Sequence, residues 1–334
     1  MIEKRLEFNG SKITLNGINY LARRVKNLSE QSEKLVITYS DGLEKKDYVL
    51  TTQLDSLNKD IFYEDPRWFI NPEDELYCSV IVVHFIKERG HNTAVGYFKF
   101  IKEQSIQKLI IPDFKQNVFP FKIEYLNSTT LFPLEKNWQF FFSGNNLYCY
   151  YSLYPESILL KIKCETGEIL RKKRCVYPRN LNYGFISGGA NPVLKDDFLY
   201  SFFHTFTEIK ALKGEKKRNY HIGVALIDKN YPFLIRKISE YPIYSSTASN
   251  PSNLGDYIIF PGSVSYENDT WQIFCGKNDE ELVTIEMETS ELARNLILIT
   301  TASLFHKIKI DLIHLYFQIR RKGLSFYIRI VKRG

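Results

Sequence analysis

Five hairpin-like segments recur along this chain, and they limit its fold more than any other feature of the sequence. In each, a polar residue leads into a short apolar strand, a turn follows at Gly, Asn or Asp, and a second apolar strand returns. They start at positions 8, 64, 135, 188 and 260, so their spacings are 56, 71, 53 and 72 residues. Repeats of this length, with almost no helical periodicity, predict radial repetition of four-stranded sheets. We therefore predict an all-β fold, a five-bladed β-propeller, with a β-sandwich or two stacked β domains as the alternatives.

The composition agrees with strands in a chain that can bury a substantial core. The protein has 334 residues, of which 44% are hydrophobic and 25% are charged, as in ordinary soluble globular proteins. Aromatic residues reach 15%, and this excess favours strands over helices. The five cysteines show no Cys-x-x-Cys spacing, and His and carboxylates do not cluster at ligand spacing. We therefore expect a reducing compartment and neither a disulfide framework, a metal nor a cofactor.

The positive charge is concentrated near the C-terminal end. The net charge is +7, but residues 294–334 contain nine Lys or Arg against one acidic residue, Asp311. We predict a nearly neutral propeller at residues 1–293 and a short basic, aromatic C-terminal extension at residues 294–334. The extension fits a closing strand with a terminal helix, a weak contact with an anionic membrane surface, or a solvated element without a partner. A neutral main body without a recognised nucleic-acid motif argues against nucleic-acid binding.

The N-terminal residues and the length of the apolar runs indicate the compartment in which we expect the protein. The first ten residues, MIEKRLEFNG, contain no apolar segment of the kind that a secretory signal needs. No run of about 18 apolar residues occurs, so we expect no membrane-spanning helix. The expectation is a cytoplasmic protein, and the sequence does not specify its oligomeric state.

One short motif, Glu64-Asp65-Pro66-Arg67, brings two carboxylates and a guanidinium to the beginning of an apolar strand. Proline fixes its own φ and pushes the preceding residue toward extended geometry, so we expect the Asp65 carboxylate to be held in an extended conformation. A held acid beside a fixed cation is a candidate general acid with an anion clamp. A surface turn with an Asp–Arg ion pair is the alternative, because short motifs need structural context.

The propeller prediction supplies that context, because the innermost strands of all blades line one central channel. Polar residues at corresponding points of the repeats would then converge on one pocket. These are Asn9, Asp65 with Arg67, Lys136 with Asn137, and Asn191 at the strand entries, and Arg23 or Arg24, His204 and residues 277–279 where strands return. Such side chains, with aromatic residues between them, suit a sugar with an anion nearby, since hydroxyls need donors and acceptors and aromatic faces cover the ring.

Taken together, motifs spread over residues 8–289 resemble those of glycoside hydrolase family 130. This family comprises five-bladed-propeller β-mannoside phosphorylases and mannosidases, and its relatives include β-1,2-mannosyltransferases. Glu64-Asp65-Pro66-Arg67 looks like the family signature. The other similar segments are Asn9 with residues 20–23, Glu135-Lys136-Asn137, residues 189–192 with Phe203-His204, residues 221–228, residues 259–262 and residues 276–279.

The resemblance implies an enzyme that acts on β-mannosides without a bound cofactor. Asp65 would be the general acid that helps the glycosidic oxygen leave, acting through a sugar hydroxyl. Inorganic phosphate, as co-substrate, would attack the anomeric carbon with inversion, and Lys136 and His204 would hold it. A phosphorylase needs just one protein carboxylate, whereas an inverting hydrolase needs a second to activate water. The residues implied in binding the oligosaccharide or glycan substrate are Asn9, Arg23, Glu64, Arg67, Asn137, Asn191 and Asp279.

The chain departs from the family pattern at several of these segments. Tyr-His-Gly of the family becomes Phe203-His204-Thr205, Tyr-Tyr-Gly becomes Phe274-Cys275-Gly276, and residues 91–96 stand where phosphorylases carry further arginines for phosphate. Three functions therefore stay open. The first is inverting phosphorolysis or hydrolysis of β-mannosides, the second is a mannosyltransferase-like glycosyltransferase on the same propeller, and the third is a non-catalytic glycan-binding propeller.

Overall fold

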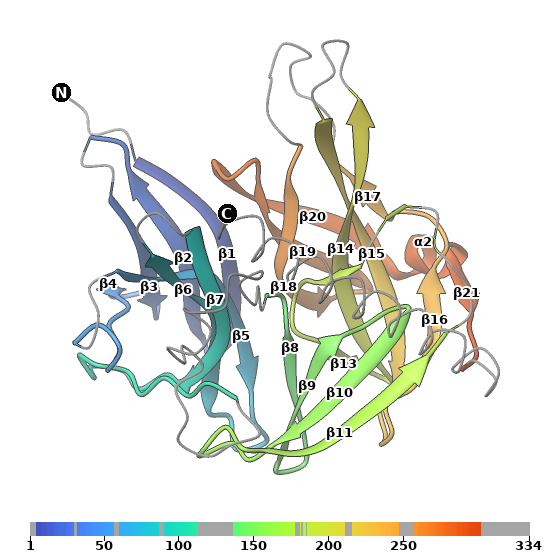
Figure 1. The fold of residues 1–334 in the computed structure, drawn as a ribbon, viewed down its shortest axis with the longest axis horizontal. Coiled ribbons are helices and arrows are strands. Elements are labelled where there is room, and N and C mark those ends of the chain that lie inside the picture. Colours follow the sequence, from blue (N-terminus) through green and yellow to red (C-terminus); the bar gives the residue numbers. More distant parts are fainter. Residues whose placement is uncertain are drawn as a thin grey trace, which may run out of the picture.

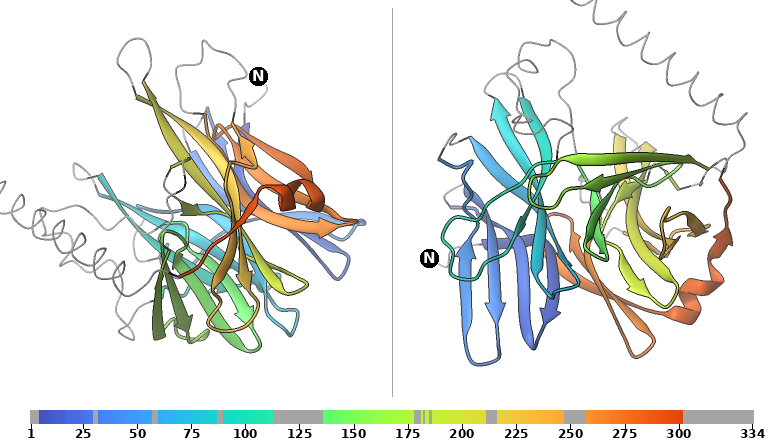
Figure 2. Two further views of the ribbon diagram at one scale, coloured as in Figure 1. Left: turned by 90° about the vertical axis from the view of Figure 1, so that its right-hand side faces the viewer. Right: turned by 90° about the horizontal axis from the view of Figure 1, so that it is seen from below.

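The computed structural model describes residues 5–29, 32–56, 60–86, 90–112, 136–177, 181, 183–184, 186–210, 216–246 and 257–301. Within these ranges the backbone forms five β-sheets, and the only helix is α2 (Thr289–Arg294). Figures 1 and 2 show the sheets following one another along the chain, with the blue strands of the first sheet beside the orange strands of the last. The predicted all-β class is therefore confirmed.

Each sheet is built mainly from strands that are consecutive in sequence and antiparallel, as repeated hairpins require. The first sheet contains β1 (Arg5–Leu15), β2 (Ile18–Asn27), β3 (Ser32–Ser40) and β4 (Lys45–Val49). The second contains β5 (Ile61–Ile70), β6 (Leu76–Ile86) and β7 (Gly90–Lys99). The third contains β8 (Gln139–Ser143), β9 (Asn146–Ser152), β10 (Glu156–Ile162) and β11 (Ile169–Val176).

The fourth sheet has the longest strands, and the fifth follows it. The fourth contains β12 (Ser187–Gly188), β13 (Val193–Lys195), β14 (Phe198–Lys210), β15 (Lys216–Asp228), β16 (Ile235–Ser239), β17 (Tyr244–Ser245) and β21 (Leu296–Leu298). The fifth contains β18 (Ile259–Glu267), β19 (Thr270–Lys277) and β20 (Glu281–Glu288). The β14–β15 hairpin rises well above the neighbouring strands in Figure 1.

The five sheets contact one another in cyclic order. β1 contacts β5, β5 contacts β8, β9 contacts β12, β14 contacts β18, and β18 contacts β1. Side chains bind neighbouring backbones across these junctions: the Trp68 N–H donates to Ser11 Oγ at 3.0 Å, and the Lys12 N–H donates to Ser263 Oγ at 2.7 Å. The last sheet thus returns to the first, and residues of β1, β5 and β18 are brought close together.

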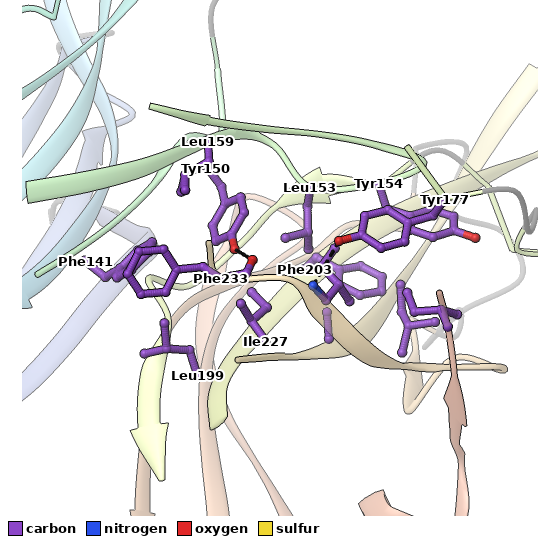
Figure 3. Packing of buried hydrophobic residues seen from close by; sticks show 14 of the residues in the cluster. Phe141, Tyr150, Leu153, Tyr154, Leu159, Tyr177, Leu199, Phe203, Ile227 and Phe233 are labelled. Atoms are coloured by element: carbon purple, nitrogen blue, oxygen red, sulfur yellow. Dashed lines mark hydrogen bonds between the residues drawn. The ribbon is translucent and has the colours of Figure 1, made fainter. Parts of the chain in front are cut away.

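Hydrophobic clusters fill the spaces between successive sheets. Figure 3 shows the cluster between the third and fourth sheets, where Phe141 packs edge-on against Phe233 with ring centroids 5.1 Å apart. Tyr150 is fully buried there, and its hydroxyl donates to the Phe233 carbonyl at 2.6 Å. Burying one large aromatic side chain stabilises a fold by roughly 2–3 kcal/mol. The aromatic excess in the sequence is therefore largely accounted for by packing between sheets.

The end of the described chain returns to the fourth sheet. After α2, β21 pairs with β16. Leu292 of α2 is buried in the hydrophobic cluster between the fourth and fifth sheets. Residues 302–334, which make up most of the predicted extension at 294–334, lie outside the described residues. Within the described ranges, no helix combines the length and the apolar character needed to cross a membrane.

Candidate active site

Four polar residues from four different sheets or their connections share an unusual backbone conformation. Asn9, Asp65, Asn137 and Asp279 have φ values of 44°, 46°, 63° and 54°. Asn9 and Asp65 lie at β-bulges, where the pairing of β1 with β2 and of β5 with β6 shifts. A bulge redirects a side chain, and Asn and Asp tolerate positive φ better than other residues with a Cβ. Non-glycine residues held in this region cluster at functional sites.

The conformation of Asp65 differs from the extended geometry expected before Pro66. Its positive φ is incompatible with a regular extended strand. The reason is the bulge between Glu64 and Arg67, which inserts Asp65 and Pro66 out of register with β6. The expectation that proline would hold Asp65 extended was therefore wrong, because the local preference is overridden by the bulge.

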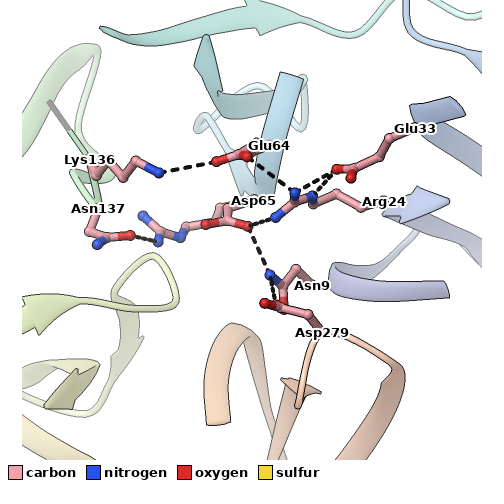
Figure 4. A network of polar contacts seen from close by, with 9 residues as sticks. Asn9, Arg24, Glu33, Glu64, Asp65, Lys136, Asn137 and Asp279 are labelled. Carbon is pink, nitrogen blue, oxygen red and sulfur yellow. Dashed lines mark hydrogen bonds and ion pairs between the residues drawn. The ribbon is translucent and has the colours of Figure 1, made fainter. Parts of the chain in front are cut away.

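Asn9 links two of the predicted site carboxylates. Its Nδ2 donates to Asp65 Oδ1 at 3.2 Å and to Asp279 Oδ1 at 2.8 Å (Figure 4). Gly276 leaves room for this amide, since a Cβ there would lie 2.1 Å from Asn9 Oδ1. Asn9 is buried, whereas Asp279 lies at the exposed side of the cluster. One amide therefore fixes the relative positions of carboxylates that are 214 positions apart in sequence.

Arg24 contacts three carboxylates, and it approaches the same oxygen of Asp65, Oδ1, as Asn9 does (Figure 4). Its Nε donates to Glu33 Oε1 at 2.6 Å, its Nη2 lies 3.1 Å from Glu64 Oε1, and its Nη1 lies 3.4 Å from Asp65 Oδ1. Burial by itself would lower the pKa of Arg24, but the charges of Asp65, Glu64 and Glu33 outweigh burial and raise the pKa. Arg24 is therefore a permanent cation at this position.

A second buried guanidinium, Arg67, occupies the side of the cluster toward the third sheet. Its Nη2 donates to Asn137 Oδ1 at 2.8 Å and its Nη1 donates to the Trp138 carbonyl at 3.0 Å, while its plane lies 4.9 Å from the Phe260 ring centroid. Burial lowers the pKa of Arg67 to about 10, although nearby Asp65 opposes this shift. Arg67 is still charged at neutral pH, and its three partners fix its orientation.

The two residues predicted to hold phosphate differ in charge and in exposure. Lys136 is partly exposed, and its Nζ lies 3.2 Å from Glu64 Oε2. His204 is buried, with its ring 4.9 Å from that of Phe260. Burial and then the charge of Arg67 lower the pKa of His204 to about 3, so the ring is neutral at physiological pH. Among the described residues its buried Nδ1 has no hydrogen-bond partner.

Two predicted binding residues are engaged elsewhere. Arg23 points to the face of the first sheet opposite Arg24, where Nε donates to Glu7 Oε2 at 2.7 Å and Nη1 donates to Thr38 Oγ1 at 2.5 Å. The Asn191 amide joins two sheets, accepting from the Phe140 N–H at 2.7 Å and donating to the Trp68 carbonyl at 3.2 Å. The structure thus brings together Asn9, Glu64, Asp65, Arg67, Lys136, Asn137, His204 and Asp279, but neither Arg23 nor the amide of Asn191.

Glu33 is a member of this cluster that sequence reasoning did not identify, and Arg24 was left as an alternative to Arg23. Pairing of Lys26 with Glu33 in the β2–β3 hairpin places Glu33 next to Arg24 on one face of the sheet. Strand alternation could have separated Arg23 from Arg24 only if the position of the β1 bulge had been known. No motif in the sequence distinguishes Glu33 from an ordinary charged residue of a hairpin.

The arrangement can bind hydroxyl groups and transfer a proton. Asp65 and Asp279 are acceptors, Asn9 is a donor, and Arg24 and Arg67 supply positive charge on two sides. Desolvation by the protein around it and the charge of Asp65 raise the pKa of Asp279, while Arg24 and the Asn9 bond oppose the rise. Within the described residues, no group of three His, Cys, Asp or Glu could hold a metal ion.

Comparison with known proteins shows that several carbohydrate-active enzymes have a similar fold. No family model matches the chain. A β-1,2-mannobiose phosphorylase from Listeria innocua is 26% identical over 123 residues, which is 36% of this chain and 32% of that protein. The match therefore spans about a third of the relative's length.

Solved structures resemble the fold over most of the chain. A complex of the Listeria innocua β-1,2-mannobiose phosphorylase with β-1,2-mannobiose has a TM-score of 0.56 at 17% identity and covers 86% of this chain and 91% of that one. A GDP-Man-dependent mannosyltransferase from Leishmania mexicana has a TM-score of 0.55 at 13% identity, covering 85% and 86%. A mannose phosphorylase from Leishmania mexicana, in complex with a phosphate ion, has a TM-score of 0.56 at 10% identity, covering 90% and 89%. The expected likeness to the mannoside phosphorylases and mannosyltransferases is thus confirmed for the fold.

Proposed function

We propose that the protein is a carbohydrate-active enzyme that acts on β-mannosides, with Asp65 as its general acid. The observation that carries this proposal is the placement of Asp65 on a positive-φ bulge, where its Oδ1 is contacted by both the amide of Asn9 and the guanidinium of Arg24. Backbone strain at a polar residue persists only where surrounding structure holds it, and the interactions of Asp65 supply that support. The name of the Listeria relative, a β-1,2-mannobiose phosphorylase, supports a β-mannoside as the substrate.

We also propose that the five sheets are the blades of a five-bladed β-propeller and that the site lies at one mouth of its axis. The cyclic contacts between sheets support this arrangement, as does the convergence of Asn9, Asp65 and Asn137, which lie in or just before inner strands of three sheets. Residues that share a level on inner strands would face a common channel. The site would then be built by loops and bulges on a rigid frame.

In this proposal Asp65 donates a proton toward the glycosidic oxygen as the bond to the anomeric carbon breaks. Asn9, Glu64 and Asp279 would bind hydroxyls of the mannosyl unit, and Arg24 takes the place first expected for Arg23. Arg67, held by Asn137, would orient Asp65 and the ligand. Asn191 would contribute indirectly, by fixing the backbone of Arg67 and Trp68.

The attacking group defines the reaction, and two groups are compatible with these residues. Inorganic phosphate would be held by Lys136, by the unpaired Nδ1 of His204 and by Arg67, giving inverting phosphorolysis. Water would instead need a second carboxylate as a base, and Asp279 and Glu64 are the nearest acidic groups. In both reactions Asp65 keeps the same role.

A glycosyltransferase is the second candidate, and the charge pairing favours it over phosphorolysis. Lys136 is paired with Glu64, Arg24 with three carboxylates, and His204 is neutral, so among these described groups only Arg67 would offer inorganic phosphate a positive charge that no carboxylate pairs. The Leishmania neighbour described as GDP-Man-dependent supports a transferase on this fold. A nucleotide sugar would bring its own leaving group and need a different anion clamp.

One assay separates these functions. The protein is incubated with a panel of β-mannosides, including β-1,2-mannobiose, with and without phosphate, and with GDP-mannose plus mannose. Mannose 1-phosphate reports phosphorolysis, free mannose without phosphate reports hydrolysis, and elongated products report transfer. Thermal stabilisation by sugar without any product would identify a glycan-binding protein and contradict the proposed enzyme.

A further inference from the structure

The contacts of Arg24 are unequal, and the closest belong to a residue outside the predicted site. Glu33 Oε1 lies 2.6 Å from Nε and 2.5 Å from Nη2 of Arg24, whereas Asp65 Oδ1 lies 3.4 Å from Nη1. Glu33 is on β3 of the first sheet and Asp65 is on β5 of the second, so the two carboxylates attract the guanidinium from opposite sides. The Arg24 guanidinium also packs on the face of Phe8, with its central carbon 4.8 Å from the ring centroid.

This inequality matters if Asp65 is a general acid. A guanidinium close to a carboxyl group favours the ionised form, but a general acid has to carry a proton when the substrate binds. A strong ion pair between Arg24 and Asp65 would therefore oppose catalysis. Glu33 binds Arg24 more closely than Asp65 does, and the Arg24–Asp65 ion pair is the longest of the three.

We propose that Glu33 is a positioning residue that holds Arg24 back from Asp65 and thereby keeps Asp65 able to carry the proton that it donates. This inference rests on the proposed role of Asp65 as general acid. Arg24 then has two roles. Its ion pair with Glu64 holds the residues of the site in place, while its contact with Asp65 stays longer than a close ion pair. Glu33 acts through Arg24 and touches no substrate.

The charged and titratable groups around Asp65 come from several elements. They are Arg24 on β2, Glu33 on β3, Glu64 and Arg67 on β5, Lys136 before β8, neutral His204 on β14, and Asp279 after β19. Replacing Glu33 by glutamine changes one of these charges and leaves the others in place. The expected change in the pH dependence therefore has a defined sign.

In Glu33→Gln, Arg24 loses its closest anionic partner and pairs more strongly with Asp65. Asp65 then loses its proton at lower pH, so the alkaline limb of the pH profile of kcat/KM moves toward acid. We expect a shift of about one pH unit and about a tenfold loss of kcat/KM at pH 7, most of which is recovered at lower pH. Glu33→Asp keeps the charge on a shorter side chain and is expected to restore much of the wild-type profile.

The matched control is Glu7→Gln, which removes the carboxylate bound to Arg23 on the opposite face of the same sheet. Each variant is assayed with the full-length protein and β-1,2-mannobiose across the pH range, and thermal unfolding confirms that it is folded. The proposal is supported if Glu33→Gln shifts the alkaline limb to lower pH and Glu7→Gln does not. It is overturned if the limb of Glu33→Gln stays in place, with an equal loss at every pH, or moves to higher pH.

The failure of this inference is distinguishable from failure of the proposed function. If the wild-type protein turns over no β-mannoside, or if Asp65→Asn is fully active, the proposed function fails and the role of Glu33 fails with it. If Asp65→Asn is inactive but Glu33→Gln only unfolds more easily and keeps the wild-type pH profile, the function stands and Glu33 is merely structural.

Discussion

Arg23 and Arg24 are neighbours in sequence and belong to the same strand, yet their side chains lie on opposite faces of the first sheet. Arg23 is buried and contacts residues of its own sheet, namely Glu7 on β1, Thr38 on β3 and Asp47 on β4. Arg24 reaches across to the bulge of β5, where it meets Glu64 and Asp65. The same chemical group therefore stabilises a sheet on one face and organises a candidate active site on the other, because successive side chains of a strand point to opposite faces.

The largest difference between the two faces is expected from their aspartates. Asp65→Asn should lower kcat by about 10³-fold, because a general acid contributes that order of rate, while the fold is retained. Asp47→Asn, 3.9 Å from Arg23 on the other face, should leave turnover close to wild type. Initial rates on a β-mannoside and thermal unfolding of both variants provide the measurement. Equal activity of the two variants would remove the distinction between the faces.

Replacing each arginine in turn should separate catalysis from stability. Arg24→Met leaves three carboxylates without their shared cation, so we expect about a 10²-fold loss of kcat/KM. Arg23→Met leaves Thr38 and Glu7 without their donor, so we expect a loss of about 1–3 kcal/mol in the free energy of unfolding. Denaturant titration and steady-state kinetics on both variants test this. A specific loss of sugar affinity in Arg23→Met, without loss of stability, would instead support the assignment made from the sequence.

The bridge formed by Asn9 can be disturbed without changing any charged group. In Gly276→Ala the new Cβ would lie 2.1 Å from Asn9 Oδ1 and 2.7 Å from its backbone nitrogen, so Asn9 must move. We expect about a tenfold loss of activity with a loss of about 1–3 kcal/mol in stability, as for other overpacked sites. Gly262→Ala, whose Cβ would lie 1.8 Å from the Gly10 carbonyl oxygen, strains a different junction. If both variants lose stability but Gly276→Ala keeps full activity, the Asn9 bridge is not required.

A further expected difference is in how stability depends on pH, and it concerns His204. The folded state holds the pKa of His204 near 3, below its ordinary value of 6.5, so the unfolded chain binds an extra proton between these values. This contribution to stability is complete above pH 6.5 and is lost as the pH falls toward 3. His204→Gln should flatten the dependence of the unfolding free energy on pH in this window. An unchanged slope in the variant would show that His204 is not held neutral in the folded protein.

Much of the fold and part of the site could be predicted from the sequence because both depend on repeated local patterns. The hairpins follow from alternating apolar residues and turn residues, and the polar entries at Asn9, Asp65 and Asn137 recur at comparable points. Their convergence follows once the sheets are placed in cyclic contact. Charge and hydroxyl-binding capacity could be read from the residue types alone.

What could not be predicted depends on geometry that single residues do not encode. Pro66 favours an extended Asp65, but the bulge gives it a positive φ. Because of the bulge at Asn9, counting alternate residues along the strands does not show which arginine faces the site. Asn191 has the residue type of a sugar ligand, yet its amide joins Phe140 to Trp68 across two sheets. Glu33 enters the cluster only through the pairing of β2 with β3.

The most direct test of the central claim, that Asp65 and the residues around Arg24 form a β-mannoside site, is a crystal structure of Asp65→Asn with β-1,2-mannobiose. The predicted result is a mannosyl unit whose oxygens lie within hydrogen-bond distance of the residue 65 side chain, Asn9 and Asp279, with Arg23 still bound to Glu7. A sugar bound on the Arg23 face of the first sheet, or a disaccharide bound without any contact to residue 65, would contradict it.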